Sequence, residues 1–385
     1  PPQGGEASWY NSALLISAGA TGAFLSDNII SFFAFHELAL IPTFVMIGLY
    51  GRGDRRTTAW RATLYLGLAS MVLLAALLMI GTQAGFTFSG LKDFMASGRE
   101  LAHAELIGAL LIAGFGTLIS LFPFHSWAAP AYASAPAPVA MMHAGVLKKF
   151  GLYGLFMFQP LMETGFLPWT NILLVLLVCN VIWVGYVTVN QKRLDLLLGN
   201  SSVMHMGYIF LAFAALVVSG SAEANPWALK GAALLMLAHG LTIALLFLLC
   251  GQIEKQTGTL EINSLGGLST RLPRMAFVFG LAGMASIGLP GLANFPGEFM
   301  VFFSGFAGFS NGFGPVQIAT ILCLWGLVIG AVYMLRAYRN IFQGDLSKAS
   351  AYATGLQPSE RAANCFLVIA LAVFGFFPTL VLQFF

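Results

Sequence analysis

Long apolar stretches alternate with short polar segments along almost the whole chain. About eleven of them approach the roughly 20 mainly apolar residues that a membrane-spanning helix needs. They cover residues 9–26, 28–50, 61–82, 104–127, 136–158, 167–189, 195–219, 226–252, 272–304, 315–341 and 363–384. Only 9% of the 385 residues are charged, whereas a soluble domain carries about 25%. The pattern predicts an all-α, multi-pass membrane protein.

Proline and glycine interrupt several of these stretches. Pro123 divides the fourth, Pro136 and Pro138 open the fifth, and 286-SIGLPGLANFPGEF-299 breaks the ninth. Broken helices at corresponding positions of two halves indicate a transport site. The fourth and ninth stretches lie five helices apart, and an odd spacing makes a repeat inverted in the membrane.

We therefore expect two inverted five-helix repeats followed by an extra helix. The expected division is an N-terminal segment 1–8, a first repeat 9–158, a second repeat 159–341, and a loop with a C-terminal helix in 342–385.

Basic residues are distributed unevenly between the two ends of these helices. One end receives most of them: Arg52, Arg55, Arg56, Arg61, Lys192, Arg193, Lys255, Arg271, Arg274, Arg336, Arg339, Lys348 and Arg361. The other end receives only Lys92, Arg99 and Lys230. Because cytoplasmic loops are enriched in lysine and arginine, the first end is expected to be cytoplasmic. The N-terminus of the chain then lies inside and Phe385 outside. Basic residues placed beside helices in this way give no reason to expect a nucleic-acid partner.

Two adjacent lysines, Lys148 and Lys149, lie in the middle of the apolar stretch 139-VAMMHAGVLKKFGLYGLFMF-158. An ammonium at that depth costs a few kcal/mol, so it usually faces a protein interior or a water path. The two side chains are about 100° apart around a helix, and Lys149 is the one expected to face the bundle interior. A structural ion pair between helices is the alternative role.

Two carboxylates, Glu37 and Glu298, are also surrounded by apolar sequence. Ionisable groups inside a membrane usually belong to ion or proton pathways. The alternative for Glu37 is a neutral acid bonded to a neighbouring helix. The alternative for Glu298 is to cap the half-helix that restarts after the PGLANFPG turn. A chain that places its few charges in this way is expected to move protons or ions.

Histidines complete the set of candidate residues. His205 and His239 lie in apolar helices, where each is either a proton relay or a satisfied core residue. His36, His125 and His143 are secondary candidates. Neither the histidines nor the four separated cysteines have metal-ligand spacing, and no phosphate loop or nucleophile elbow occurs. We therefore expect neither a metal nor a cofactor in this chain.

Several motifs together resemble the antiporter-like subunits of respiratory complex I, above all those of the subunit M (chain 4) type. They are FFAFHELALIPTFVMIGLYG, LFPFHSWAAPAYASAPAPVAMMHAGVLKKFGLYGLF, LLLGNSSVMHMGYIFLAF, LAHGLTIALLFLLCGQIEKQTGTLEINSLGGL and ASIGLPGLANFPGEFMVFF. The resemblance covers essentially the whole chain in the family's order. Members usually have fourteen helices in inverted five-helix repeats, and this chain is similar to the last eleven.

The resemblance implies roles for four residues. Glu37 matches the family's fifth-helix glutamate, and Lys149 matches the eighth-helix lysine of the motif AG-V-L-K-K. His239 matches the eleventh-helix histidine. Glu298 matches the twelfth-helix glutamate, where subunit L and sodium–proton antiporter relatives typically carry lysine.

Three positions depart from the family pattern. The seventh-helix lysine that partners the fifth-helix glutamate is Leu118 here, and the usual proline-aspartate after His125 reads Ala129-Pro130. The lysine that opens the tenth helix is Asp195. His36 and His125 are the candidates for a replacement cation.

The resemblance implies a proton-translocating membrane subunit of NADH:quinone oxidoreductase in a bacterial inner membrane, with other membrane-arm subunits of complex I as partners. Flavin, iron–sulfur clusters and the quinone would be held by partner subunits. A subunit of a multi-chain cation/proton antiporter or of a hydrogenase-linked pump is one alternative. A non-pumping structural subunit is another.

Overall fold

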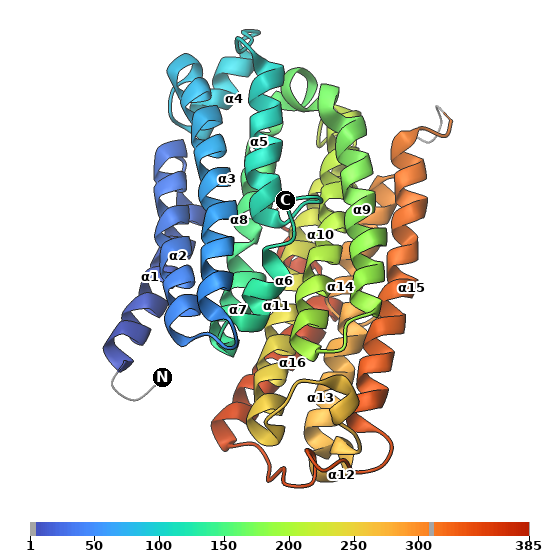
Figure 1. The fold of residues 1–385 in the computed structure, drawn as a ribbon. Helices are drawn as coiled ribbons and strands as arrows, with labels where there is room; N and C mark the ends of the chain where they lie inside the picture. Colours follow the sequence, from blue (N-terminus) through green and yellow to red (C-terminus); the bar gives the residue numbers. More distant parts are fainter. Residues whose placement is uncertain (1–4, 308–311, 385) are drawn as a thin grey trace.

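The computed structural model describes residues 5–307 and 312–384 (Figure 1). Within these residues all regular secondary structure is helical apart from two isolated β-bridges, as the apolar pattern predicts. The principal helices are α1 (Glu6–Leu25), α2 (Ile29–Tyr50), α3 (Arg55–Ala84), α4 (Phe88–Ala96), α5 (Ala104–Ile119), α6 (Ala128–Ser134), α7 (Ala137–Met142), α8 (Lys149–Met157), α9 (Thr170–Val189), α10 (Leu194–Ser219), α11 (Pro226–Thr257), α12 (Leu268–Arg271), α13 (Pro273–Ser286), α14 (Asn294–Ser304), α15 (Pro315–Phe342), α16 (Pro358–Phe376) and α17 (Thr379–Leu382).

Seven helical segments within the described ranges are long and apolar enough to cross a membrane. They are α2, α3, the segment 159–189 that contains α9, α10, α11, α15 and α16. The sequence predicts about eleven membrane-spanning stretches, four more than the seven segments that meet these length and composition criteria. The predicted stretches 104–127, 136–158 and 272–304 are helical but interrupted, so their separate helices are shorter than a span. The fourth, 9–26, forms the 20-residue helix α1, which is long enough but is not among the seven apolar segments.

The proline- and glycine-rich interruptions occur where the sequence predicts them. Turns over 120–127 separate α5 from α6, and the segment 287–293 separates α13 from α14. The lysine stretch contains α7, a π-helical turn (His143–Leu147) and α8. Such interruptions leave backbone carbonyls free inside the protein, where polar side chains reach them.

Two features of the helices differ from the sequence prediction. The short helix α4 lies in a connection where the sequence predicts no helix. A search for membrane spans passes over it, because its nine residues are too few to cross a membrane. Of the expected N-terminal segment 1–8, residues 1–4 lie outside the described residues, and α1 already begins at Glu6.

Helix α10 is the centre of the bundle. Its apolar window is 94% buried, whereas that of α16 is only 11% buried. It packs against α9, α11, α6, α14 and α15, so it contacts both broken regions (Figure 1). Polar side chains on α10 are therefore shielded from lipid and lie between the two halves.

Ion pairs form at the end of the bundle where the basic residues gather. Arg52, in the α2–α3 loop, pairs with Glu254 near the end of α11. The Arg193 guanidinium contacts the Asp195 carboxylate at 2.7 Å, which raises the pKa of that guanidinium. Asp195 is fully buried and paired, so its carboxylate stabilises the start of α10.

Candidate functional site

The two lysines lie where the π-helical turn meets α8, and both side chains are buried. The Lys149 ammonium donates a hydrogen bond to the Ala144 carbonyl oxygen at 2.6 Å. The Lys148 ammonium has no hydrogen-bond acceptor among the described residues and lies 5.3 Å from the centroid of the Tyr132 ring. Burial therefore does not distinguish Lys149 from Lys148, contrary to the expectation that only one of them faces the interior.

Lys149 also reaches an apolar cleft of about 360 Å³ between α1, the π-helical turn and α11. Glycines bring the walls of this cleft together: a Cβ on Gly240 would lie 2.7 Å from the Gly145 carbonyl oxygen. The Lys149 side chain runs beside Gly240, next in sequence to His239. The lysine thus connects the first half of the chain with α11.

Glu37 lies on α2 with two polar neighbours. Its Oε1 accepts a hydrogen bond from the Ser70 hydroxyl at 2.5 Å and lies 3.2 Å from the Nδ1 atom of His36. His36 is buried, whereas the Glu37 side chain is 28% exposed. Of the two proposed replacement cations, His36 is therefore the one placed beside the glutamate. Leu118 is buried and apolar, so it supplies no counter-charge.

His143 and His125 lie near the first broken helix. The His143 ring is buried against Tyr132 and Trp127, and its centroid lies 5.2 Å from that of Tyr132. It is within electrostatic range of both His36 and Lys148. His125 stacks on Phe122, and its Nδ1 has no hydrogen-bond partner in the described part of the chain.

His205 and His239 form a stacked pair between α10 and α11, with ring centroids 5.3 Å apart. The Nε2 atom of His239 lies 3.1 Å from the Ser202 hydroxyl. Both lysines are within electrostatic range of His239. The paired rings therefore continue the set of buried polar groups from Lys149 to helices α10 and α11.

His205 places each ring nitrogen against a backbone carbonyl. Nδ1 lies 2.8 Å from the Ser201 oxygen, and Nε2 lies 2.9 Å from the Ser286 oxygen. Carbonyls only accept hydrogen bonds, whereas a neutral imidazole has a single N–H donor. Only a doubly protonated ring satisfies both contacts at once. This geometry suits a group that receives a proton on one nitrogen and releases one from the other.

Glu298 is buried on α14, and its Oε1 has no hydrogen-bond partner among the described residues. The start of α14 has no side-chain cap hydrogen bond, so Glu298 does not cap the half-helix through a hydrogen bond. Gly288 makes room for the carboxylate: its φ is +80°, and a Cβ there would lie 2.0 Å from Oε2. The interrupted helix thus brings a carboxylate, whose Oε1 has no partner in the described part of the chain, next to the backbone.

Sequence reasoning missed Tyr208, which joins His205 to Glu298. Its ring lies 5.5 Å from the His205 ring, and the residue is within electrostatic range of Glu298. Its hydroxyl is buried without a hydrogen-bond partner in the described chain. The spacing of three residues from His205, which puts both on one helix face, is the signal that identifies it.

Together these groups form a polar series inside an apolar bundle, with close contacts at some steps and only electrostatic proximity at the others. In order they are Glu37, His36, His143, Lys148, Lys149, His239, His205, Tyr208 and Glu298. Groups of this kind exchange protons, and the described residues include no cluster of ligands for a metal ion. Asp195 stands apart from the series, paired with Arg193.

Comparisons with known proteins show which proteins this chain resembles. The family described as "NADH:quinone oxidoreductase/Mrp antiporter, TM" matches residues 26–324. NAD(P)H-quinone oxidoreductase chain 4 2 of Microcystis aeruginosa is 33% identical over 93% of this chain and 64% of its own length. Chain 4 1 of Synechococcus elongatus is 35% identical over 96% of this chain and 68% of its own length. The chain therefore spans about two thirds of these curated relatives.

Solved structures show the same fold. A chain of respiratory complex I from Thermus thermophilus with bound NADH superposes with a TM-score of 0.86 at 27% identity, covering 97% of this chain and 76% of that one. A chain of the Mrp complex from Dietzia sp. gives a TM-score of 0.81 at 20% identity, covering 97% of this chain and 75% of that one. The fold is thus shared between both classes of assembly.

Proposed function

The chain belongs to the membrane-subunit family shared by NADH:quinone oxidoreductases and Mrp antiporters, and on this premise we propose that it is a proton-translocating subunit of an NADH:quinone oxidoreductase. The polar series from Glu37 to Glu298 is the observation that carries the proposal. An apolar bundle has no structural reason to bury two ammonium groups and an unpaired carboxylate.

In the proposed mechanism, quinone reduction elsewhere in the complex shifts the proton affinities of Glu37 and Lys149. Protons pass from Lys149 to His239 and His205 and leave by way of Glu298. The Ser286 carbonyl, left free at the end of α13, orients the His205 ring for this transfer. Flavin, iron–sulfur clusters and the quinone are assigned to partner subunits, so this chain itself carries no electrons.

We further propose the inverted five-helix repeat. Its support is the matching pattern of contacts: α1, α2 and α3 pack in sequence, as α9, α10 and α11 do. Helix α3 then packs on the broken pair α5 and α6, and α11 packs on the broken pair α13 and α14. The basic loops gather at one end of the bundle, which supports eleven crossings with a cytoplasmic N-terminus in a bacterial inner membrane (Figure 1).

The assembly can be tested directly. If a tagged form of this chain is purified from its native membrane in mild detergent, we expect NADH dehydrogenase subunits with flavin and iron–sulfur clusters to accompany it. Mass spectrometry and optical spectra of the purified assembly are the measurements. Recovery with hydrogenase or cation/proton antiporter subunits would instead favour the alternative class of assembly. The glutamate at position 298 argues against that alternative.

The role of His36 as counter-cation gives a second prediction. Helices α3 and α5 pack side by side in opposite directions, and Gly114 on α5 contacts Leu73 on α3. About one turn further along, Leu118 on α5 and Ser70 on α3 therefore lie at the same level. His36→Leu should lower the proton-to-electron ratio by removing the imidazole beside Glu37. Adding Leu118→Lys should restore the ratio, since a lysine there reaches the same carboxylate.

The control for this pair is His103→Asn, which removes an exposed loop histidine at a position whose φ of +59° asparagine also tolerates. An unchanged ratio in His36→Leu, with normal assembly, would remove His36 from the pathway. If complexes that carry Glu37→Gln or Glu298→Gln also keep a normal proton-to-electron ratio, this subunit does not pump, and the structural alternative holds.

A further inference from the structure

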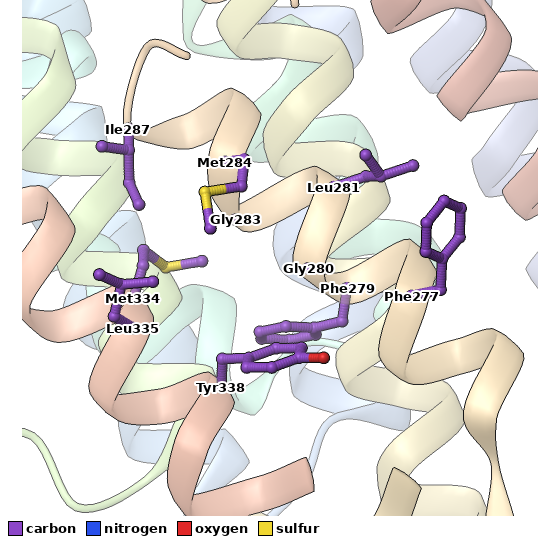
Figure 2. A pocket seen from close by; sticks show the side chains of 10 residues that line it. All are labelled: Phe277, Phe279, Gly280, Leu281, Gly283, Met284, Ile287, Met334, Leu335 and Tyr338. Atoms are coloured by element: carbon purple, nitrogen blue, oxygen red, sulfur yellow. The ribbon is translucent and has the colours of Figure 1, made fainter. Parts of the chain in front are cut away.

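An apolar groove of about 250 Å³ lies between α13 and α15, away from the polar series. Figure 2 shows its walls, with Phe277, Leu281 and Met284 on α13 and Met334, Leu335 and Tyr338 on α15. The Phe277 side chain is 66% exposed and that of Leu335 is 47% exposed. The groove therefore opens to the outside of the bundle.

Two glycines make the floor of the groove. A Cβ on Gly280 would lie 3.4 Å from the Tyr338 ring, and one on Gly283 would lie 3.3 Å from the Met334 methyl carbon. The absence of side chains at these positions lets Tyr338 and Met334 lie close to the backbone of α13, so the base of the groove stays low between the two helices.

The dimensions of the groove fit one leaflet of a bilayer. From Phe277 to Ile287 the helix rises about 15 Å, which is about half of a 30 Å hydrocarbon core. Ile287 ends the groove at the interruption of the helix, as a membrane midplane would require.

Positive charge stands at the other end of the groove. Arg274 precedes Phe277 by three residues, so it lies on the same face of α13 one turn away. Arg271 precedes Arg274 by another three residues, on α12. Both side chains are exposed, and neither forms a hydrogen bond or ion pair with the described residues.

We propose that this groove is a binding site for an anionic phospholipid, with one acyl chain between α13 and α15 and the phosphate against Arg274 and Arg271. Basic residues beside a cleft between membrane helices select anionic headgroups. The lipid holds α13 against α15 and so steadies the half-helix whose last carbonyl, that of Ser286, contacts His205.

The test uses the assembled complex in liposomes that contain a phosphatidylglycerol with a photoreactive diazirine on its acyl chain, compared with the matching phosphatidylcholine. After irradiation, labelled peptides are identified by mass spectrometry. We expect the phosphatidylglycerol to label 277–287 and 334–338 preferentially. Arg274→Gln should reduce that preference about fivefold, and Gly280→Leu, which fills the floor, should abolish labelling.

Two variants serve as matched controls. Arg361→Gln removes an exposed arginine at the start of α16, and Gly67→Leu adds a leucine at an exposed glycine of α3 with nothing within 4 Å. Both should label as the unaltered protein does. Equal labelling by the two lipids, an equal loss in Arg361→Gln, or a groove that cross-links to a partner subunit instead of lipid would overturn the proposal.

Discussion

Replacing Lys149 with methionine is expected to reduce proton transfer through this chain about 100-fold, the scale on which a positioned acid or base contributes. Methionine keeps the length and apolar stem of lysine but carries no proton. The ammonium is buried with a single carbonyl acceptor, so its removal costs little structure. The measurement is the proton-to-electron ratio of the assembled complex in proteoliposomes, with assembly checked on a native gel.

Lys149→Arg distinguishes a proton carrier from a fixed charge. A guanidinium stays protonated at every physiological pH, so arginine preserves the charge but does not release a proton. The neighbouring cleft of about 360 Å³ accommodates its larger head. We expect Lys149→Arg to fail as Lys149→Met does. Lys230→Met, at the start of α11, is the control and should pump normally. Normal pumping in Lys149→Arg would show that only the charge is needed.

The sequence alone predicts the broken helices well, because proline and glycine act locally. Pro123 and Pro290 each remove a backbone donor, and the helices are interrupted around them at 120–127 and 287–293, whereas Pro296 lies in the first turn of α14. The π-helical turn before Lys149 has no comparable local signal. It depends on the close approach of Gly145 to Gly240, which lie far apart in the sequence.

The candidate residues were also easier to find than their partners. A lysine or glutamate within an apolar stretch is conspicuous, so Lys148, Lys149, Glu37 and Glu298 could be singled out directly. Contacts made by backbone carbonyls leave no trace in composition. The carbonyl of Ser286 and the space beside Gly288 depend on how two half-helices meet, which only the tertiary structure defines.

Gly288→Ala is expected to impair proton transfer as severely as Glu298→Gln, about 100-fold. A non-glycine residue at φ +80° costs about 1–2 kcal/mol. The larger effect is steric: the new methyl group would lie 2.0 Å from Oε2 of Glu298 and must displace the carboxylate. The proton-to-electron ratio and the thermal stability of the assembled complex are the two measurements.

Gly291→Ala separates strain from displacement. Gly291 has a similarly positive φ of +91°, but a Cβ there meets the Phe376 ring at 3.2 Å, not the carboxylate. We expect Gly291→Ala to lose comparable stability and still pump. Combining Gly288→Ala with Glu298→Gln should be no worse than either alone, because both remove the same proton acceptor. Equal loss of pumping in Gly288→Ala and Gly291→Ala would mean that the turn matters only for folding and that Gly288 has no part in holding Glu298.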